Sequence, residues 1–207
     1  TSVQNAENKR FLLELGTMCT DAHIECTNGK KSATGEPTET AIVNAALDEN
    51  IDKNKLYTKM ERVKDIPFDS TRKMMSTIHK NNVGFRVITK GAPDVIIGRC
   101  SKYKDGNLLK EIDETTKRKI EETNLNMAQK ALRVIAVAYK DVSSIPNNVD
   151  SKTIENDLIF VGLIGMIDPP REGVKEAVAT CRRAGIKTVM ITGDHIVTAK
   201  AIAKELG

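Results

Sequence analysis

The pentapeptide Lys90-Gly91-Ala92-Pro93-Asp94 combines residue types that suit the binding of a phosphate group. It completes the alternating segment 85–90, a pattern that predicts a strand. Pro93 is preset for the first turn of a helix. The motif therefore predicts an ammonium group at a sheet edge beside a helix start, which is a favourable place for an anion. By itself, the pentapeptide also fits an ordinary strand-to-helix turn with a solvated Lys90.

Phe68 offers a flat apolar face and Glu39 a hydrogen-bond acceptor. With 4 Phe, 3 Tyr and no Trp, the chain has few aromatic rings that could stack on a flat ligand. Lys73 and Arg133 add positive charge. Each has a structural alternative: core packing for Phe68, charge compensation at a helix N-terminus for Glu39, solvation for Lys73 and a sheet-edge ion pair for Arg133.

Two further motifs lie in the last forty or so residues. Thr192-Gly193-Asp194 follows a predicted strand and precedes a helix, so it would face a phosphoryl group at the carboxyl end of a sheet. A strand ending in a turn, with Asp194 as helix N-cap, is the alternative. Asp168-Pro169-Pro170-Arg171 predicts a stiff hinge, because two prolines restrict the backbone between charged residues that can pair.

The elements that must position these residues follow an α+β pattern. Apolar spacing predicts a helix over 7–18 and another from Pro37, separated by a loop over 27–35. Alternation over 66–90, with a turn at 81–84, predicts an antiparallel hairpin. A short helix over 93–100, a longer one over 113–132, a strand over 133–139 and a surface loop over 141–157 follow. The chain then changes to strand 158–167, helix 172–184, strand 187–192 and helix 196–206, which predicts a partial parallel βαβ unit.

Composition excludes several classes of protein. The chain has 207 residues, of which 40% are apolar and 29% charged, and its net charge of +4 comes without a basic block for nucleic acid or a membrane surface. No apolar run approaches the ~20 residues of a membrane span. The four cysteines show no C-x-x-C pair, which favours reduced thiols in the cytosol. Cys19, His23 and Cys26 fit no common zinc ligand set, so we expect no protein-held metal.

Six motifs, in this order, resemble those of the P-type ATPase family, and their form is most similar to its calcium pumps. They are Gly35-Glu36-Pro37-Thr38-Glu39-Thr40-Ala41, Phe68-Asp69-Ser70-Thr71-Arg72-Lys73, Lys90-Gly91-Ala92-Pro93-Asp94, Ala131-Leu132-Arg133, Asp168-Pro169-Pro170-Arg171 and Thr192-Gly193-Asp194. The resemblance implies a nucleotide-binding (N) domain over 1–163, with an antiparallel sheet flanked by helices. It also implies part of a haloacid-dehalogenase-like phosphorylation (P) domain over 164–207.

The resemblance also implies roles. Phe68 would stack on adenine and Glu39 would accept a hydrogen bond from its amino group, while Lys73, Lys90 and Arg133 would hold the phosphates beside Gly91 and Ala92. Thr192, Gly193 and Asp194 would orient the phosphoryl group, Mg or the ribose. Calcium pumps of animals carry an arginine two residues after the phenylalanine. This chain has Ser70 there, which leaves Arg72 or Lys73 to supply the charge.

The family's D-K-T-G-T and G-D-G-x-N-D strings do not occur in this sequence. We therefore expect a soluble, monomeric excerpt that binds ATP without turnover. In the intact enzyme it would position Mg-ATP at the cytoplasmic face of a membrane, with the remaining P domain, the A domain and the transmembrane helices as partners. Alternatives are a fragment of a haloacid-dehalogenase-like phosphatase, which would need a D-x-D-x-T that is absent here, and a non-catalytic nucleotide-sensing module.

Overall fold

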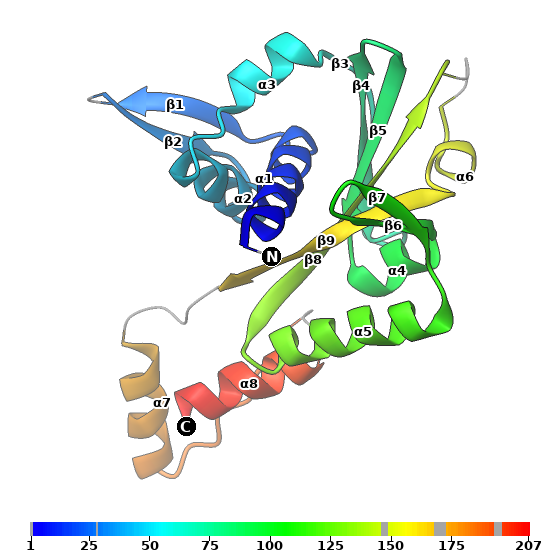
Figure 1. Ribbon diagram of the computed structural model, residues 1–207. Helices are drawn as coiled ribbons and strands as arrows, with labels where there is room; N and C mark the ends of the chain where they lie inside the picture. The colour runs from blue at the N-terminus through cyan, green and yellow to red at the C-terminus, as the bar shows by residue number, and fades with distance from the viewer. Residues whose placement is uncertain (1, 28, 146–148, 168–172, 193–195) are drawn as a thin grey trace. The chain divides into compact units, whose positions relative to one another are not determined.

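The computed structural model describes residues 2–27, 29–145, 149–167, 173–192 and 196–207 (Figure 1). Contacts divide the chain into two compact units. The first consists of Thr1–Lys117 and Ile135–Ile164, and the second of Arg118–Val134 and Gly165–Gly207. These units do not test the domain boundary predicted at 163/164, which stays a prediction.

The first unit begins with helices and a small hairpin (Figure 1). α1 (Ser2–Met18) is followed by β1 (His23–Thr27) and β2 (Lys30–Thr34), which pair in antiparallel fashion. α2 (Pro37–Asp48) starts at the predicted proline, and α3 (Lys53–Lys59) follows. The predicted loop over 27–35 is therefore wrong for 30–34. The residues of β2 are polar or small and almost all exposed, so they give no apolar alternation that would reveal a strand.

A seven-stranded sheet forms the body of the fold. Its order is β3 (Arg62–Asp69), β4 (Met74–Asn81), β5 (Gly84–Gly91), β8 (Leu132–Val142), β9 (Leu158–Ile167), β6 (Cys100–Asp105) and β7 (Leu108–Glu111). The predicted hairpin is confirmed as β4 and β5, whose turn lies at 81–84. The expectation of an antiparallel sheet is wrong for one pair of strands, because β6 and β9 pair in parallel. The fold is thus α+β with a mixed sheet.

Both faces of the sheet are covered within the first unit. On one face, Leu15, Met18 and Cys19 pack against Met75 and Ile88. On the other, Ile78 and Val87 meet Ile154 of the short helix α6 (Ser151–Ile154). α4 (Pro93–Gly98) directly follows β5, and α5 (Glu114–Ala128) precedes β8. Alternate residues of β4 and β5 therefore lie in separate hydrophobic clusters.

The second unit contains α7 (Val174–Arg183) and α8 (Ile196–Leu206), both close to their predicted ranges. The predicted strand over 187–192 is wrong, since these residues have no regular secondary structure. Val189 and Ile191 are 74% and 94% exposed. A strand is stabilised by its ladder with a neighbour, and in the described residues this segment has no strand partner. The predicted βαβ unit is therefore not formed, and its haloacid-dehalogenase-like character is not confirmed.

Candidate functional site

One end of the sheet brings several of the predicted residues together. Phe68 lies near the end of β3, Lys73 precedes β4, and Lys90 and Gly91 end β5. In the ladder Lys90 is opposite Met75 and Gly91 is opposite Met74. The backbone N–H of Ala92 donates to the carbonyl oxygen of Lys73 at 2.9 Å. The two motifs that contain Phe68 and Lys90 are thus neighbours at this sheet end.

Lys90 is buried, with 6% of its surface exposed. Its Nζ donates to Oε1 of Glu39 at 2.5 Å. In the part of the chain that the structure describes, this is the one hydrogen bond recorded for the ammonium group. Because an ammonium has three N–H donors, two remain for acceptors that are not supplied by these residues. The alternative of a solvated Lys90 is therefore excluded, and two N–H donors of the buried ammonium have no acceptor among the described residues.

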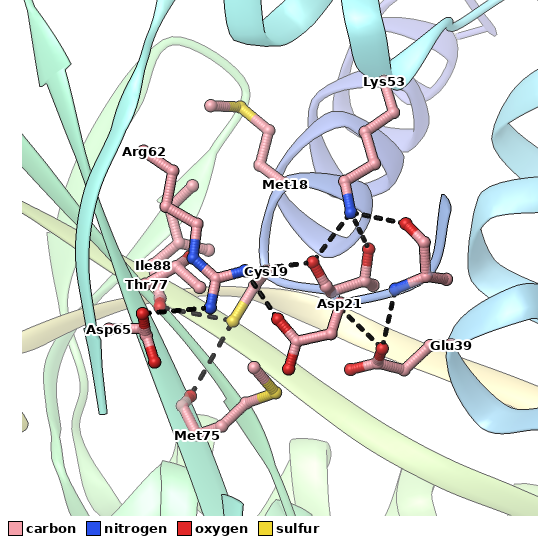
Figure 2. A network of polar contacts seen from close by, with 12 residues as sticks. Met18, Cys19, Asp21, Glu39, Lys53, Arg62, Asp65, Met75, Thr77 and Ile88 are labelled. Carbon is pink, nitrogen blue, oxygen red and sulfur yellow. Dashed lines mark hydrogen bonds and ion pairs between the residues drawn. The ribbon is translucent and has the colours of Figure 1, made fainter. Parts of the chain in front are cut away.

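Glu39 is held in place by the backbone that follows α1 (Figure 2). Its Oε2 accepts hydrogen bonds from the N–H groups of Asp21 and Ala22, at 2.7 and 3.1 Å. It lies in the first turn of α2, where the helix dipole favours a carboxylate. With the Lys90 ammonium, three donors contact a group that has about four acceptor sites. The carboxylate is thus oriented from two sides and retains room for one more donor.

Two cations fix the segment that holds Glu39, as Figure 2 shows. The Nζ of Lys53 donates to the carbonyls of Thr20 and Ala22, at 2.8 and 2.7 Å, and to the Thr20 hydroxyl at 3.0 Å. Arg62, from β3, bonds Oδ1 of Asp21 at 2.6 Å. Burial lowers the pKa of Lys53 to about 8, although the Glu39 charge raises it. α3 and β3 therefore brace the backbone that orients Glu39.

Phe68 and Lys73 are both exposed. Phe68 has 62% of its surface in solvent, which excludes the core-packing alternative. Phe68 lies between Ile66, which is opposite Ser76, and Asp69, which is opposite Met74, where the ladder shifts register, so strand alternation does not assign its ring to a face of the sheet. Lys73 has a positive φ of 54°, an uncommon conformation for a residue other than glycine. An accessible ring and an accessible ammonium thus come from the two segments that flank the start of β4, at the sheet end where β5 ends with Lys90 and Gly91.

Gly91 is required by close packing between β4 and β5. A Cβ at this position would lie 2.4 Å from the carbonyl oxygen of Lys73 and 2.5 Å from the Cβ of Met74. Ala92 is the N-cap of α4, with Pro93 at the first helical turn as predicted. The Lys-Gly-Ala-Pro motif thus has a structural reason for its glycine, whatever else it does.

Arg72 and Lys73, the two cations that the sequence leaves for the phosphate, differ in their surroundings, because only the side chain of Arg72 is engaged within the described part of the chain. The guanidinium of Arg72 pairs with Glu155 and donates to the carbonyl of Pro67 at 2.5 Å. Lys73 is exposed and has no recorded side-chain partner among the described residues. Sequence reasoning missed both Glu155 and Met75. Met75 could have been found from the alternating pattern of the hairpin, which places it opposite Lys90. No sequence pattern around Glu155 indicates its role.

The other predicted residues lie in the second unit or outside the described residues. Arg133 and Thr192 are both exposed and belong to the second unit, so their roles stay predictions. Gly193, Asp194 and the hinge residues Asp168, Pro169, Pro170 and Arg171 lie outside the described residues. Within the described residues, no group of three or more His, Cys, Asp or Glu could hold a metal ion. No helix in that part of the chain is long and apolar enough to cross a bilayer.

Comparisons with known proteins agree on one family. A family profile described as “P-type ATPase, cytoplasmic domain N” matches residues 8–173. “Calcium-transporting ATPase 1” of Bacillus cereus is 44% identical over 203 residues, which are 98% of this chain and 22% of that protein. “Calcium-transporting ATPase” of Bacillus subtilis is 42% identical over 207 residues, which are 99% of this chain and 23% of that protein.

A eukaryotic relative gives the same result. “Calcium-transporting ATPase PAT1” of Dictyostelium discoideum is 41% identical over 184 residues, covering 87% of this chain and 16% of that protein. The chain thus spans about a fifth of the length of the curated relatives it matches. The family resemblance read from the motifs is confirmed, and the chain belongs to the P-type ATPases, of which it contains cytoplasmic domain N.

Proposed function

We propose that the chain binds ATP at the sheet end formed by Phe68, Lys73, Lys90 and Glu39. The observation that carries this proposal is the buried ammonium of Lys90, which has Glu39 as its one recorded partner among the described residues and keeps two donors open. A buried donor without an acceptor is unfavourable, so a ligand that supplies acceptors would be stabilised there.

The geometry suggests a division of roles. The family resemblance implies a phosphate contact for Lys90. Because Lys90 contacts Glu39, we instead assign both groups to the base end of the ligand. Glu39 would accept a hydrogen bond from the adenine amino group. The exposed Phe68 ring, from the same end of the sheet, would stack on the base. Lys73, accessible at the neighbouring turn, would meet the phosphates.

We propose that this chain is the ATP-handling part of a larger parent protein. There it would position Mg-ATP for phosphoryl transfer to an aspartate outside the motifs found in this sequence. The transfer would drive the transport of a cation, which the names of the relatives suggest is calcium. When bound, Mg²⁺ would neutralise phosphate charge. Thr192, Gly193, Asp194 and Arg133 would contact the phosphoryl end, and residues 168–171 would form the hinge.

Calorimetric titration of the chain with ATP tests this function directly. The expected dissociation constant is upper micromolar to millimolar, since about 5 kcal/mol is typical of an open and wet site. The double variant Phe68→Ala/Lys73→Ala removes two exposed groups and should weaken binding without unfolding the chain. Wild-type affinity in this variant would disprove the site. Incubation with Mg-ATP should leave no acid-stable phosphoprotein, and a labelled aspartate would contradict the proposed division of labour.

A further inference from the structure

The ring proposed to stack on the base lies in an irregular part of its strand. The ladder between β3 and β4 shifts register between Ile66 and Asp69, and Phe68 lies within that interval. Pro67, the preceding residue, has no N–H to donate to a neighbouring strand. Regular sheet hydrogen bonding therefore does not by itself fix the backbone that presents Phe68.

Arg72 supplies the missing constraint. Its Nη2 donates to the carbonyl oxygen of Pro67 at 2.5 Å, directly before the aromatic residue. Its own backbone N–H donates to Oδ1 of Asp69 at 2.7 Å, which closes the turn on the other side of Phe68. The same turn ends at Lys73, whose N–H donates to the Asp69 carbonyl at 2.6 Å. One arginine thus ties together the segment that carries Phe68 and Lys73.

The arginine is held in turn by a carboxylate from a distant part of the chain. Its Nη1 pairs with Oε1 of Glu155, whose side chain is fully buried. Ser76 of β4 donates to the same oxygen at 2.6 Å, and Ser151 of α6 donates to Oε2. The Ser76 hydroxyl also contacts that of Thr89 at 2.8 Å. Glu155 is therefore anchored on both oxygens, on the face of the sheet opposite to Lys90.

We propose that Arg72, anchored by Glu155, is a positioning residue that fixes the Phe68 ring and the Lys73 turn for nucleotide binding. The proposal rests on the proposed function above. A side chain that is already ordered loses less conformational freedom when a ligand arrives, so preorganisation raises affinity without a new contact. This role differs from the direct phosphate contact that the sequence left open for Arg72.

The test replaces the ion pair by apolar side chains of similar size, in Arg72→Met/Glu155→Leu. Removing both charges together avoids a buried carboxylate without a partner, so the fold can survive. The matched control is Arg86→Met/Asp141→Leu. That pair has hydrogen bonds of 2.7 and 2.8 Å and lies away from the end of β5 that carries Lys90. Its arginine side chain is 21% exposed, against 15% for Arg72. All variants carry 4-fluorophenylalanine at the 4 Phe positions, and Phe68→Leu identifies the Phe68 ¹⁹F resonance.

Two readouts separate positioning from general stability. In the free chain, the Phe68 resonance should shift in the test variant and stay in place in the control, whereas urea midpoints report any loss of stability. The dissociation constant for ATP should rise about three- to tenfold in the test variant only. If the test variant does not fold, Arg72→Lys replaces it. Lysine keeps the charge but cannot bridge Glu155 and Pro67 with a planar fork, so the same shift is expected.

Each result decides the proposal. An unchanged Phe68 resonance with weaker ATP binding would mean that Arg72 acts on the nucleotide directly. An unchanged resonance with unchanged ATP binding would mean that the Arg72–Glu155 pair is purely structural. Either result overturns the proposal. A shifted resonance with unchanged affinity overturns the link to the nucleotide. If the ring moves but the wild-type chain binds no ATP, the proposed function fails while the positioning of the ring by Arg72 stands.

Discussion

The ammonium of Lys90 lies 2.5 Å from Oε1 of Glu39, although 51 residues separate them in the chain. Lys90 comes from the end of β5 and Glu39 from the first turn of α2. Both side chains are buried, and Glu39 also accepts two backbone hydrogen bonds. This pair therefore joins the sheet to the helical layer of the first unit, and it faces the site proposed for the base.

The first prediction concerns the stability of this pair. Lys90→Met leaves a buried carboxylate without its cation, so the free energy of unfolding should fall by about 3–5 kcal/mol. The double variant Lys90→Met/Glu39→Gln should lose less free energy of unfolding, because the neutral amide oxygen can still accept hydrogen bonds from the backbone N–H groups. Urea denaturation measures both variants. Lys110→Met, at an exposed pair with Asp105, is the control and should change nothing measurable. Equal losses for the single and double variants would contradict the buried-pair interpretation.

The second prediction separates binding from folding at Phe68. The ring is 62% exposed, so Phe68→Ala should change the free energy of unfolding by no more than about 0.5 kcal/mol. Loss of stacking on the base should weaken ATP binding by about 1–3 kcal/mol. Thermal unfolding and an ATP titration on the same sample check the two parts. A large loss of stability would show that the ring packs in the fold, and unchanged affinity would remove it from the site.

The third prediction concerns the backbone contact at Gly91. Gly91→Ala introduces a Cβ within 2.4 Å of the Lys73 carbonyl, so β4 and β5 must separate and the chain should lose about 1–3 kcal/mol. Gly98→Ala is the matched control. Apart from its chain neighbours and the backbone of its own helix, no heavy atom of the described residues lies within 4 Å of the added Cβ, and the residue ends α4. The substitution should therefore be neutral or slightly stabilising. Chemical denaturation of both variants measures the difference, and equal stabilities would contradict the predicted clash.

The fourth prediction is a pH dependence that arises at His79. Burial, with the nearby charges of Arg62 and Lys53, lowers its pKa from 6.5 to about 4, although its bond to the Met60 carbonyl opposes this. The unfolded chain therefore binds more protons between these values, so stability falls as pH falls from 6.5 to 4. The loss from this group between pH 7 and pH 4 should be about 3 kcal/mol.

Urea denaturation of wild type and His79→Gln at several pH values isolates this effect from the carboxylates, which titrate in both proteins. The stability of the variant should fall less steeply between pH 6.5 and pH 4. Parallel pH profiles for the two proteins would mean that His79 keeps an ordinary pKa in the folded chain.

The sequence by itself determined the family and most of the local structure. The six ordered motifs were sufficient for the family because each couples a backbone requirement to a polar side chain, as in Lys90-Gly91-Ala92-Pro93. The helix at Pro37 and the hairpin with its turn at 81–84 were also predictable, because proline, asparagine and glycine act through their own backbone angles.

Only the tertiary structure decided which of these residues meet. It paired Lys90 with Glu39, exposed Phe68, and paired Arg72 with Glu155. It also left 187–192 without the strand that its apolar residues predict. The physical reason is common to all these cases: ion pairs, burial and strand ladders depend on partners that are distant in sequence, and a local pattern contains no information about the partner.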